Sequence, residues 1–181
     1  MKYLTKGKRG KIYIDKGIAK KVSSNKTIKK EVYWLKLLNK HKIGPELINF
    51  KKNYFKYKFA EGDFILEYIE KFDKNKIKKA LIGILKQCRI LDKLKINKLE
   101  MHHPVKHIII GRKAVMIDFE RCYLTDKPKN TSQFCQFIMN TSRELNRKNI
   151  KINKKKLINK IKIYKNNQNE KNFKEIINLI A

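Results

Sequence analysis

Acidic residues are scarce in this chain, and their scarcity leaves it strongly basic. Its 181 residues include 16 Asp and Glu against 46 Lys and Arg, so the formal charge at pH 7 is +30. Such an excess favours polyanionic partners such as nucleotides, RNA or a ribonucleoprotein. Lys, Asn and Ile are nevertheless used heavily throughout, as a coding bias toward A and T produces without selection for a ligand. The charge by itself is therefore a weak indication of a partner.

Paired cysteines and long apolar runs are also missing. Cys88, Cys122 and Cys135 form no CxxC pair, which excludes a disulfide framework and a zinc knuckle. An odd number of cysteines, together with an N-terminus that has no apolar signal core, predicts a reducing, cytoplasmic location. No apolar run reaches the roughly 18–20 residues that cross a bilayer, so we expect no membrane partner.

The apolar residues that are present suffice for a core and fall into two blocks. They make up 41% of the chain. Residues 1–60 show short strand patterns around one helix, whereas residues 61–181 are mainly helical, interrupted by a strand pair near residues 107–118. We therefore expect an α+β protein of one domain, with a small β-rich lobe at 1–60 and a helical lobe at 61–181.

Two hairpins are predicted in the first block. Residues 10–22 read as two strands around Asp15-Lys16-Gly17, a turn in which glycine supplies a positive φ. Residues 46–59 read as a second strand pair around Lys51-Lys52-Asn53. Both hairpins would contribute to one antiparallel sheet.

The segment between the hairpins predicts a helix over residues 25–40. Its apolar residues recur at helical spacing, namely Ile28, Val32, Leu35 and Leu38. Asn25 or Thr27 is a candidate N-cap, and Gly44-Pro45 ends the helical pattern.

The second block predicts several amphipathic helices. Their inward faces would be formed by Ile77, Leu81, Ile84, Cys88 and Leu91; by Phe134, Phe137, Ile138 and Leu145, with a cap near Asn130 or Thr131; by Leu157, Ile161 and Tyr164; and by Phe173, Ile176, Ile177 and Ile180.

Glycines and lysines in the first block are candidates for phosphate binding. Gly7 and Gly10 precede a strand, where a glycine turn lets backbone N–H groups approach a phosphate, although a plain hairpin explains them equally well. On the following strand, Ala19 and Lys21 share a face and Lys20 points the other way. A lysine on an inner face requires an anionic partner, and Glu31 on the next helix is a natural one.

The order of these features resembles the protein-kinase-like fold. A glycine turn is followed by a strand lysine, a helix glutamate, a Gly-Pro break, two strands, helices and the sequence "VMIDF". The closest resemblance is to small archaeal proteins described as predicted serine/threonine protein kinases, related in size to the RIO kinases. Their signature is similar to "EMHHPVKHIII" followed by "VMIDFERC".

The resemblance implies ATP and Mg²⁺ as cofactors and assigns roles to particular residues. Gly7 and Gly10 match the end of the glycine loop, and Ala19 and Lys21 match the VAIK motif, with Lys20 as the alternative register. Glu31 matches the partner of the phosphate-contacting lysine, and Asp118 matches the magnesium ligand. The adenine would bond to backbone near Phe59, Ala60 and Glu61. A protein would be the phosphate acceptor.

The expected catalytic loop departs from that pattern. Aligned on its apolar strand, His102 stands where the catalytic aspartate belongs, and His107 where a metal-binding asparagine belongs. A neutral histidine accepts a proton at neutral pH, so His102 is the candidate base. His107 is the candidate second metal ligand, although it offers nitrogen where Mg²⁺ prefers oxygen. Glu120 stands in place of a glycine, where it would either add a second carboxylate or only rigidify the loop.

Three alternatives remain open at this stage. The altered loop and the basic charge favour a catalytically inactive pseudokinase or an ATPase switch that docks on RNA or a ribonucleoprotein. Lysines interleaved with aromatics at residues 51–59 are also typical of a plain nucleic-acid-binding protein. His102, His103 and His107, with Cys122, are candidate ligands for a transition metal.

Overall fold

The computed structural model describes residues 1–7 and 10–181 and is an α+β structure. It divides into two compact units: residues 1–62 together with 115–122, and residues 63–114 together with 123–181. The predicted boundary between residues 60 and 61 stays a prediction; in the structure, the segment Val115–Cys122 groups with the N-terminal residues.

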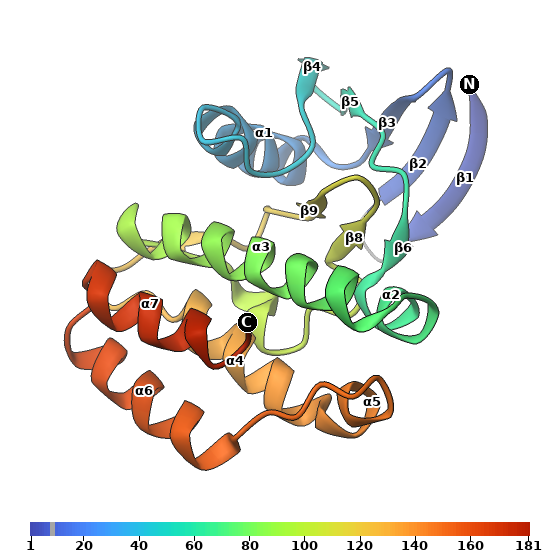
Figure 1. Ribbon diagram of the computed structural model, residues 1–181. Helices are drawn as coiled ribbons and strands as arrows, with labels where there is room; N and C mark the ends of the chain where they lie inside the picture. The colour runs from blue at the N-terminus through green and yellow to red at the C-terminus, as the bar shows by residue number, and fades with distance from the viewer. Residues whose placement is uncertain (8–9) are drawn as a thin grey trace. The chain divides into compact units, whose positions relative to one another are not determined.

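The first unit is built on a five-stranded antiparallel sheet in the order β1-β2-β3-β5-β4 (Figure 1). Its strands are β1 (Lys2–Gly7), β2 (Gly10–Asp15), β3 (Ile18–Val22), β4 (Leu47–Lys51) and β5 (Tyr54–Lys58). Both predicted hairpins are confirmed. Lys16 and Gly17 between β2 and β3 have φ values of 45° and 75°, as a tight hairpin turn requires.

Helix α1 (Asn25–Asn39) follows β3 and confirms the predicted helix. All four of its predicted inward residues are buried. The N-cap prediction was wrong by one residue or more: the hydroxyl of Ser24 accepts a hydrogen bond from the backbone N–H of Thr27. A serine with extended backbone can satisfy one of the otherwise unbonded N–H groups of the first turn, and Asn25 already lies within the helix.

The second unit is mainly helical (Figure 1). Its helices are α2 (Ile65–Lys71), α3 (Lys74–Lys93), the 3₁₀ helix η1 (Leu99–His102), α4 (Asn130–Asn140), α5 (Ser142–Arg147), α6 (Lys154–Asn166) and α7 (Glu170–Asn178). Short strands accompany them: β6 (Asp63–Phe64), β7 (Ile96–Asn97), β8 (Ile108–Ile110) and β10 (Tyr123–Leu124), with β9 (Ala114–Met116) at the boundary of the two units.

The predicted apolar faces of these helices form the core of the second unit. The five residues predicted on α3 are all buried, as are those predicted on α4 and α6. Leu145 is buried as predicted, but on the separate helix α5. On α7, Ile177 is only half-buried, whereas its predicted neighbours are buried.

A buried polar network joins α3, α4 and α6 in this unit. Asp92 accepts hydrogen bonds from the backbone N–H groups of Asn130 and Thr131 at 3.0 and 3.2 Å. It also accepts from the amide of Asn130 at 2.8 Å and from the hydroxyl of Tyr164 at 2.9 Å. Arg89 in turn donates to the Tyr164 oxygen at 3.1 Å. Asp92 therefore supplies from α3 the N-terminal cap that α4 lacks in its own sequence.

Among the residues that the structure describes, no helix is both long enough and apolar enough to span a membrane.

Candidate functional site: a carboxylate cluster around Lys21

Lys21 is a buried lysine on β3, with 6% of its surface exposed. It pairs with Phe55 across the sheet, and Ala19 pairs with Tyr57, so alternation along the strand places all four on one face. The Lys21 ammonium donates to Glu31 Oε2 at 2.7 Å and to Asp118 Oδ1 at 2.7 Å. Buried ammonium groups require such anionic partners.

The neighbouring lysine has a different environment. Lys20 is half-buried, and its ammonium lies 4.3 Å from the centre of the Tyr54 ring. The register of β3 therefore makes Lys21, rather than Lys20, the partner of Glu31. A slip of one residue would exchange the two lysines.

Glu31 comes from the second turn of α1 and is 3% exposed. It lies beside Ile28, Val32 and Leu35, which anchor the helix in the core of the first unit. A carboxylate would not remain charged at such a position without compensation, and the Lys21 ammonium supplies it.

Asp118 follows β9 and has an unusual backbone conformation. Its φ is 60°, a left-handed value that non-glycine residues rarely adopt. Strain of this kind persists only where the surroundings impose it, and it is concentrated at functional sites. The conformation directs the Asp118 carboxylate toward Lys21, while 34% of the side chain stays exposed.

Phe119 anchors this turn in the first unit. It is completely buried, and a Cβ added to Gly44 would lie 2.9 Å from its ring. Gly44 also has a φ of 79°. The sequence predicted Gly44 as a helix stop; in the structure its missing side chain also makes room for Phe119, which fixes Asp118 and Glu120 on either side.

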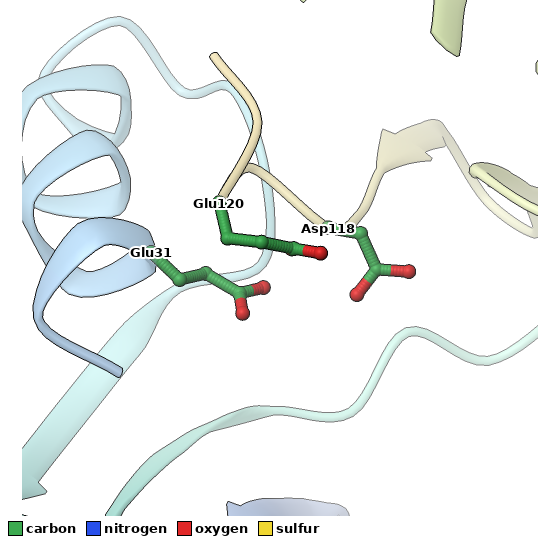
Figure 2. A group of neighbouring side chains, drawn as sticks. All are labelled: Glu31, Asp118 and Glu120. Atoms are coloured by element: carbon green, nitrogen blue, oxygen red, sulfur yellow. The ribbon is translucent and has the colours of Figure 1, made fainter. Parts of the chain in front are cut away.

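Glu120 completes a cluster of three carboxylates, which we call the carboxylate cluster. Ligand oxygens of Glu31, Asp118 and Glu120 lie within 4.8 Å of one another (Figure 2). Figure 2 shows the carboxylates from α1 and from the turn after β9 converging on the same space. Glu120 Oε2 lies 3.9 Å from the Lys21 ammonium. Three carboxylates thus surround the ammonium of one lysine.

Burial and mutual repulsion set the charge state of this cluster. Burial raises the pKa of Glu31 to about 7, against the lowering effect of the Lys21 ammonium, and the charges of Asp118 and Glu120 raise it further. Burial by itself would lower the pKa of Lys21, but the charges of Glu31 and Asp118 hold that pKa above its ordinary value. Lys21 is therefore charged at pH 7, and Glu31 gives up its proton near neutral pH.

The donor set of the cluster fits a hard divalent cation. Mg²⁺ and Ca²⁺ take oxygen ligands, and carboxylates supply both the oxygen and the charge. Among the described residues, this cluster is the one group of three or more acidic, histidine or cysteine side chains close enough to share a metal. His107 and the transition-metal set of His102, His103, His107 and Cys122 do not form such a group.

The glycines that were predicted to hold phosphate have a structural role. Gly7 pairs with Gly10 between β1 and β2, and the turn residues 8–9 lie outside the described residues. A Cβ on Gly10 would lie 2.6 Å from the carbonyl oxygen of Val22, so close strand packing alone excludes a side chain there.

The predicted adenine-binding segment follows β5. The backbone N–H of Phe59 donates to the carbonyl of Gly17 at 2.8 Å, which ties the segment to the β2–β3 turn. Ala60 and Glu61 continue without regular secondary structure. Tyr57, which the sequence did not single out, lies on the same face as Lys21; burial raises the pKa of its hydroxyl. Strand alternation from Lys21 across to β5 would have been a signal for it.

The two histidines proposed for the catalytic loop belong to the second unit. His102 ends η1 and is exposed, and its Nδ1 lies 3.0 Å from the carbonyl oxygen of Leu99. A carbonyl only accepts, so Nδ1 carries the proton and Nε2 is the basic nitrogen of the neutral ring. Sequence reasoning missed a buried ion pair in the same loop, in which Lys98 donates to Glu100 at 2.9 Å.

No known protein-family model matches this sequence, and no curated protein matches it significantly.

Proposed function

We propose that this protein is an ATP- and Mg²⁺-dependent phosphotransferase of the protein-kinase-like fold, with serine or threonine hydroxyls of a protein as acceptors. One observation carries the proposal. Residues from β3, α1 and the turn after β9, spread over 97 positions of sequence, meet with their charged atoms 2.7 Å apart. The sequence-based resemblance to predicted serine/threonine kinases assigned roles to these same residues, Lys21, Glu31 and Asp118.

Each residue has a distinct role in the proposal. Lys21 binds the α- and β-phosphate oxygens of ATP, and Glu31 holds its ammonium in place when Asp118 turns to the metal. Asp118, the most exposed of the three carboxylates in the cluster, is the principal Mg²⁺ ligand, with Glu120 beside it. Bound Mg²⁺ would neutralise charge on the transferred phosphoryl group. His102 is the proposed base for the acceptor hydroxyl.

The cluster supports this proposal through its electrostatics. Phosphoryl transfer depends mostly on positioning and on charge stabilisation, so a missing loop aspartate removes only part of the catalytic effect. A general base contributes about 10²–10⁴-fold. The carboxylate cluster stands out in a chain of net charge +30, because it gathers three of the 16 acidic residues at one point.

The test is transfer of label from γ-labelled ATP, in the presence of Mg²⁺, to the protein itself and to a generic protein acceptor. We expect Lys21→Met and Asp118→Asn to abolish transfer, and His102→Ala to lower its rate by about 10²–10⁴-fold. Lys20→Met, on the same strand and with its ammonium on Tyr54, is the matched control and should keep the wild-type rate.

Two results would count against the proposal. Equal labelling by wild type and Lys21→Met would show that Lys21 does not hold the phosphates of ATP during transfer. Binding of MgATP with no transfer to any acceptor would favour a catalytically inactive nucleotide-binding switch. The altered catalytic loop also favours this alternative.

A further inference from the structure

A second feature, in the helical unit, is a hollow of about 750 Å³ between α3 and the turn that follows β8. All of its lining residues belong to the second unit. They include six cationic side chains and no acidic one: Lys76, Lys78, Lys79, Lys86, Arg112 and Lys113. The hollow is separate in sequence and in unit from the carboxylate cluster, so its function is independent of the phosphotransfer proposal.

The lysines of α3 form a stripe along one side of the helix. Lys76, Lys79 and Lys86 lie three and seven residues apart, a spacing that keeps them on one face over about 15 Å of helix. Arg112 and Lys113 add charge from the opposite wall. An elongated row of cations matches an elongated anion, with several charges in sequence, better than it matches a single phosphate.

Most of these cations have no anionic partner within the protein. Lys76 lies 3.7 Å from Asp73, and Lys78 donates to the carbonyl oxygen of Ala181. Among the residues that the structure describes, no acidic group lies within ion-pair distance of Lys79, Lys86, Arg112 or Lys113, and all four side chains are exposed. Their mutual repulsion is therefore relieved only by solvent ions or by a ligand.

Gly83 is the independent observation that points to a ligand. It lies in the middle of α3 and lines the hollow between Lys79 and Lys86. Glycine within a helix is less stable than alanine, so a packing reason is expected for it. None is present, because a Cβ added to Gly83 would meet no heavy atom within 4 Å. The missing side chain instead leaves the floor of the hollow open for close approach of a ligand.

The apolar part of the lining is formed by small, buried or half-buried side chains, Ile82 among them. Tyr68 and Ile110 are buried, and none of the exposed large apolar side chains of the described residues lines the hollow. The exposed side chains of the lining that are larger than alanine are therefore all cationic. A membrane surface is nearly flat at this scale and would not enter the hollow. The chemistry that remains is a linear polyanion.

We infer that this basic hollow binds the phosphodiester backbone of single-stranded nucleic acid. Neutralising phosphates with lysine and arginine releases counterions, which favours binding without any reading of sequence. No residue of α6 lines this hollow, so the exposed lysines of α6 provide a comparison.

The test compares two variants of the full chain that each lose four positive charges. In the hollow variant, Lys79, Lys86, Arg112 and Lys113 are all changed to Gln. In the control variant, the exposed α6 residues Lys154, Lys155, Lys156 and Lys162 are changed to Gln. Binding of a fluorescent oligouridylate and of an oligothymidylate is measured by anisotropy over a range of salt concentrations, and binding to phosphatidylserine vesicles is measured beside it.

The hollow variant should bind the oligonucleotide on the order of a hundredfold more weakly at physiological salt. For this variant, the slope of log K, the logarithm of the binding constant, against the logarithm of the salt concentration should be smaller in magnitude by about two to three. Each lost phosphate contact removes roughly 0.7 from this slope for a single strand. The control variant should keep most of the wild-type affinity and slope. Preference for oligouridylate or for oligothymidylate would identify which nucleic acid supplies the backbone.

Equal losses of oligonucleotide affinity in the two variants would overturn the inference. Binding would then depend on the overall positive charge of the chain and not on the hollow. Vesicle binding that falls in the hollow variant while oligonucleotide binding does not would also overturn it.

Substitutions of Gly83 separate a ligand role from a structural one. Gly83→Ala should raise the midpoint of thermal unfolding, and Gly83→Met should weaken oligonucleotide binding without lowering that midpoint. A Gly83→Met protein with unchanged affinity would contradict the close approach of a ligand.

Discussion

Each of the two units contains a buried polar cluster. The two clusters contain similar residue types but differ in their roles. The Asp92 network of the helical unit consists of Arg89, Asp92, Asn130, Thr131 and Tyr164. The carboxylate cluster of the sheet unit consists of Glu31, Asp118 and Glu120 around Lys21. Both contain a carboxylate that is 3% exposed, Asp92 in one and Glu31 in the other.

The clusters differ in how their charge is compensated. Both oxygens of Asp92 accept hydrogen bonds from N–H and O–H groups, two of which are backbone donors at the start of α4. Every member of that network is buried, so it stabilises a helix junction. In the carboxylate cluster, like charges converge on one ammonium and Asp118 opens to solvent in a strained conformation. A buried cluster whose carboxylate accepts hydrogen bonds on both oxygens indicates structure, whereas one that gathers like charges and opens to solvent indicates a site.

The largest expected effect comes from breaking the Asp92 network. Asp92→Ala removes the acceptor of four hydrogen bonds and leaves buried donors unpaired. We expect a loss of about 3–5 kcal/mol in the free energy of unfolding, measured by urea denaturation. Asp126→Ala is the control, because Asp126 forms an exposed pair with Lys95 and should cost less than about 1 kcal/mol. Similar losses for the two variants would contradict the structural role of the network.

A smaller effect is expected from Gly44→Ala, which tests how the carboxylate cluster is held. The added Cβ would lie 2.9 Å from both Leu35 and Phe119, and Gly44 has a left-handed φ. We expect about 2–4 kcal/mol of destabilisation, from backbone strain and overpacking together. We also expect weaker nucleotide binding, because Phe119 holds the turn that carries Asp118.

Gly17→Ala is the matched control for Gly44→Ala. Its φ of 75° is almost the same, but a Cβ there would meet nothing within 4 Å. It should therefore show the strain alone, about 1–2 kcal/mol, and leave nucleotide binding unchanged. If both variants bind nucleotide as the wild type does, Phe119 does not position the cluster.

The pH dependence of stability provides the most specific test. The pKa of Glu31 is raised from 4.5 to about 7 in the folded protein, so between these values the folded state holds a proton that the unfolded state has lost. The contribution of Glu31 to stability should accordingly fall as pH rises from about 4.5 to 7, by at most about 1.4 kcal/mol per pH unit. Comparison with Glu31→Gln across this range isolates the effect. A wild type and a Glu31→Gln protein with parallel pH profiles would show that Glu31 does not take up a proton in the folded state.

The sequence predicted the local structure better than it predicted the contacts between elements. The turn Lys16-Gly17 and the apolar stripes of α1, α3 and α6 follow from local chemistry and periodicity, and the structure confirms them. The cap of α4 could not be found in this way, because Asp92 supplies it from 38 residues away. The predicted cap near Asn130 or Thr131 was wrong, because both residues lie inside α4 and their backbone N–H groups donate to Asp92.

The same limit applies to the candidate site. Lys21, Glu31 and Asp118 were singled out because a family resemblance fixed their order, and the register of β3 decided between Lys20 and Lys21. The approach of Gly44 to Phe119 depends on packing in three dimensions, for which one sequence carries no signal. Tyr57 was missed although strand alternation pointed to the face that it shares with Lys21. The roles of His102 and His107 stay predictions.

The most direct test of the account is a calorimetric titration of ATP, with and without Mg²⁺, into wild type, Asp118→Asn and Asp126→Asn. Each variant removes one negative charge, from the carboxylate cluster or from an exposed surface pair. We predict Mg²⁺-dependent binding of ATP that Asp118→Asn weakens on the order of tenfold or more and Asp126→Asn leaves unchanged. A wild type that binds no MgATP, or an Asp118→Asn variant that binds it as tightly as the wild type, would contradict a nucleotide site at the carboxylate cluster.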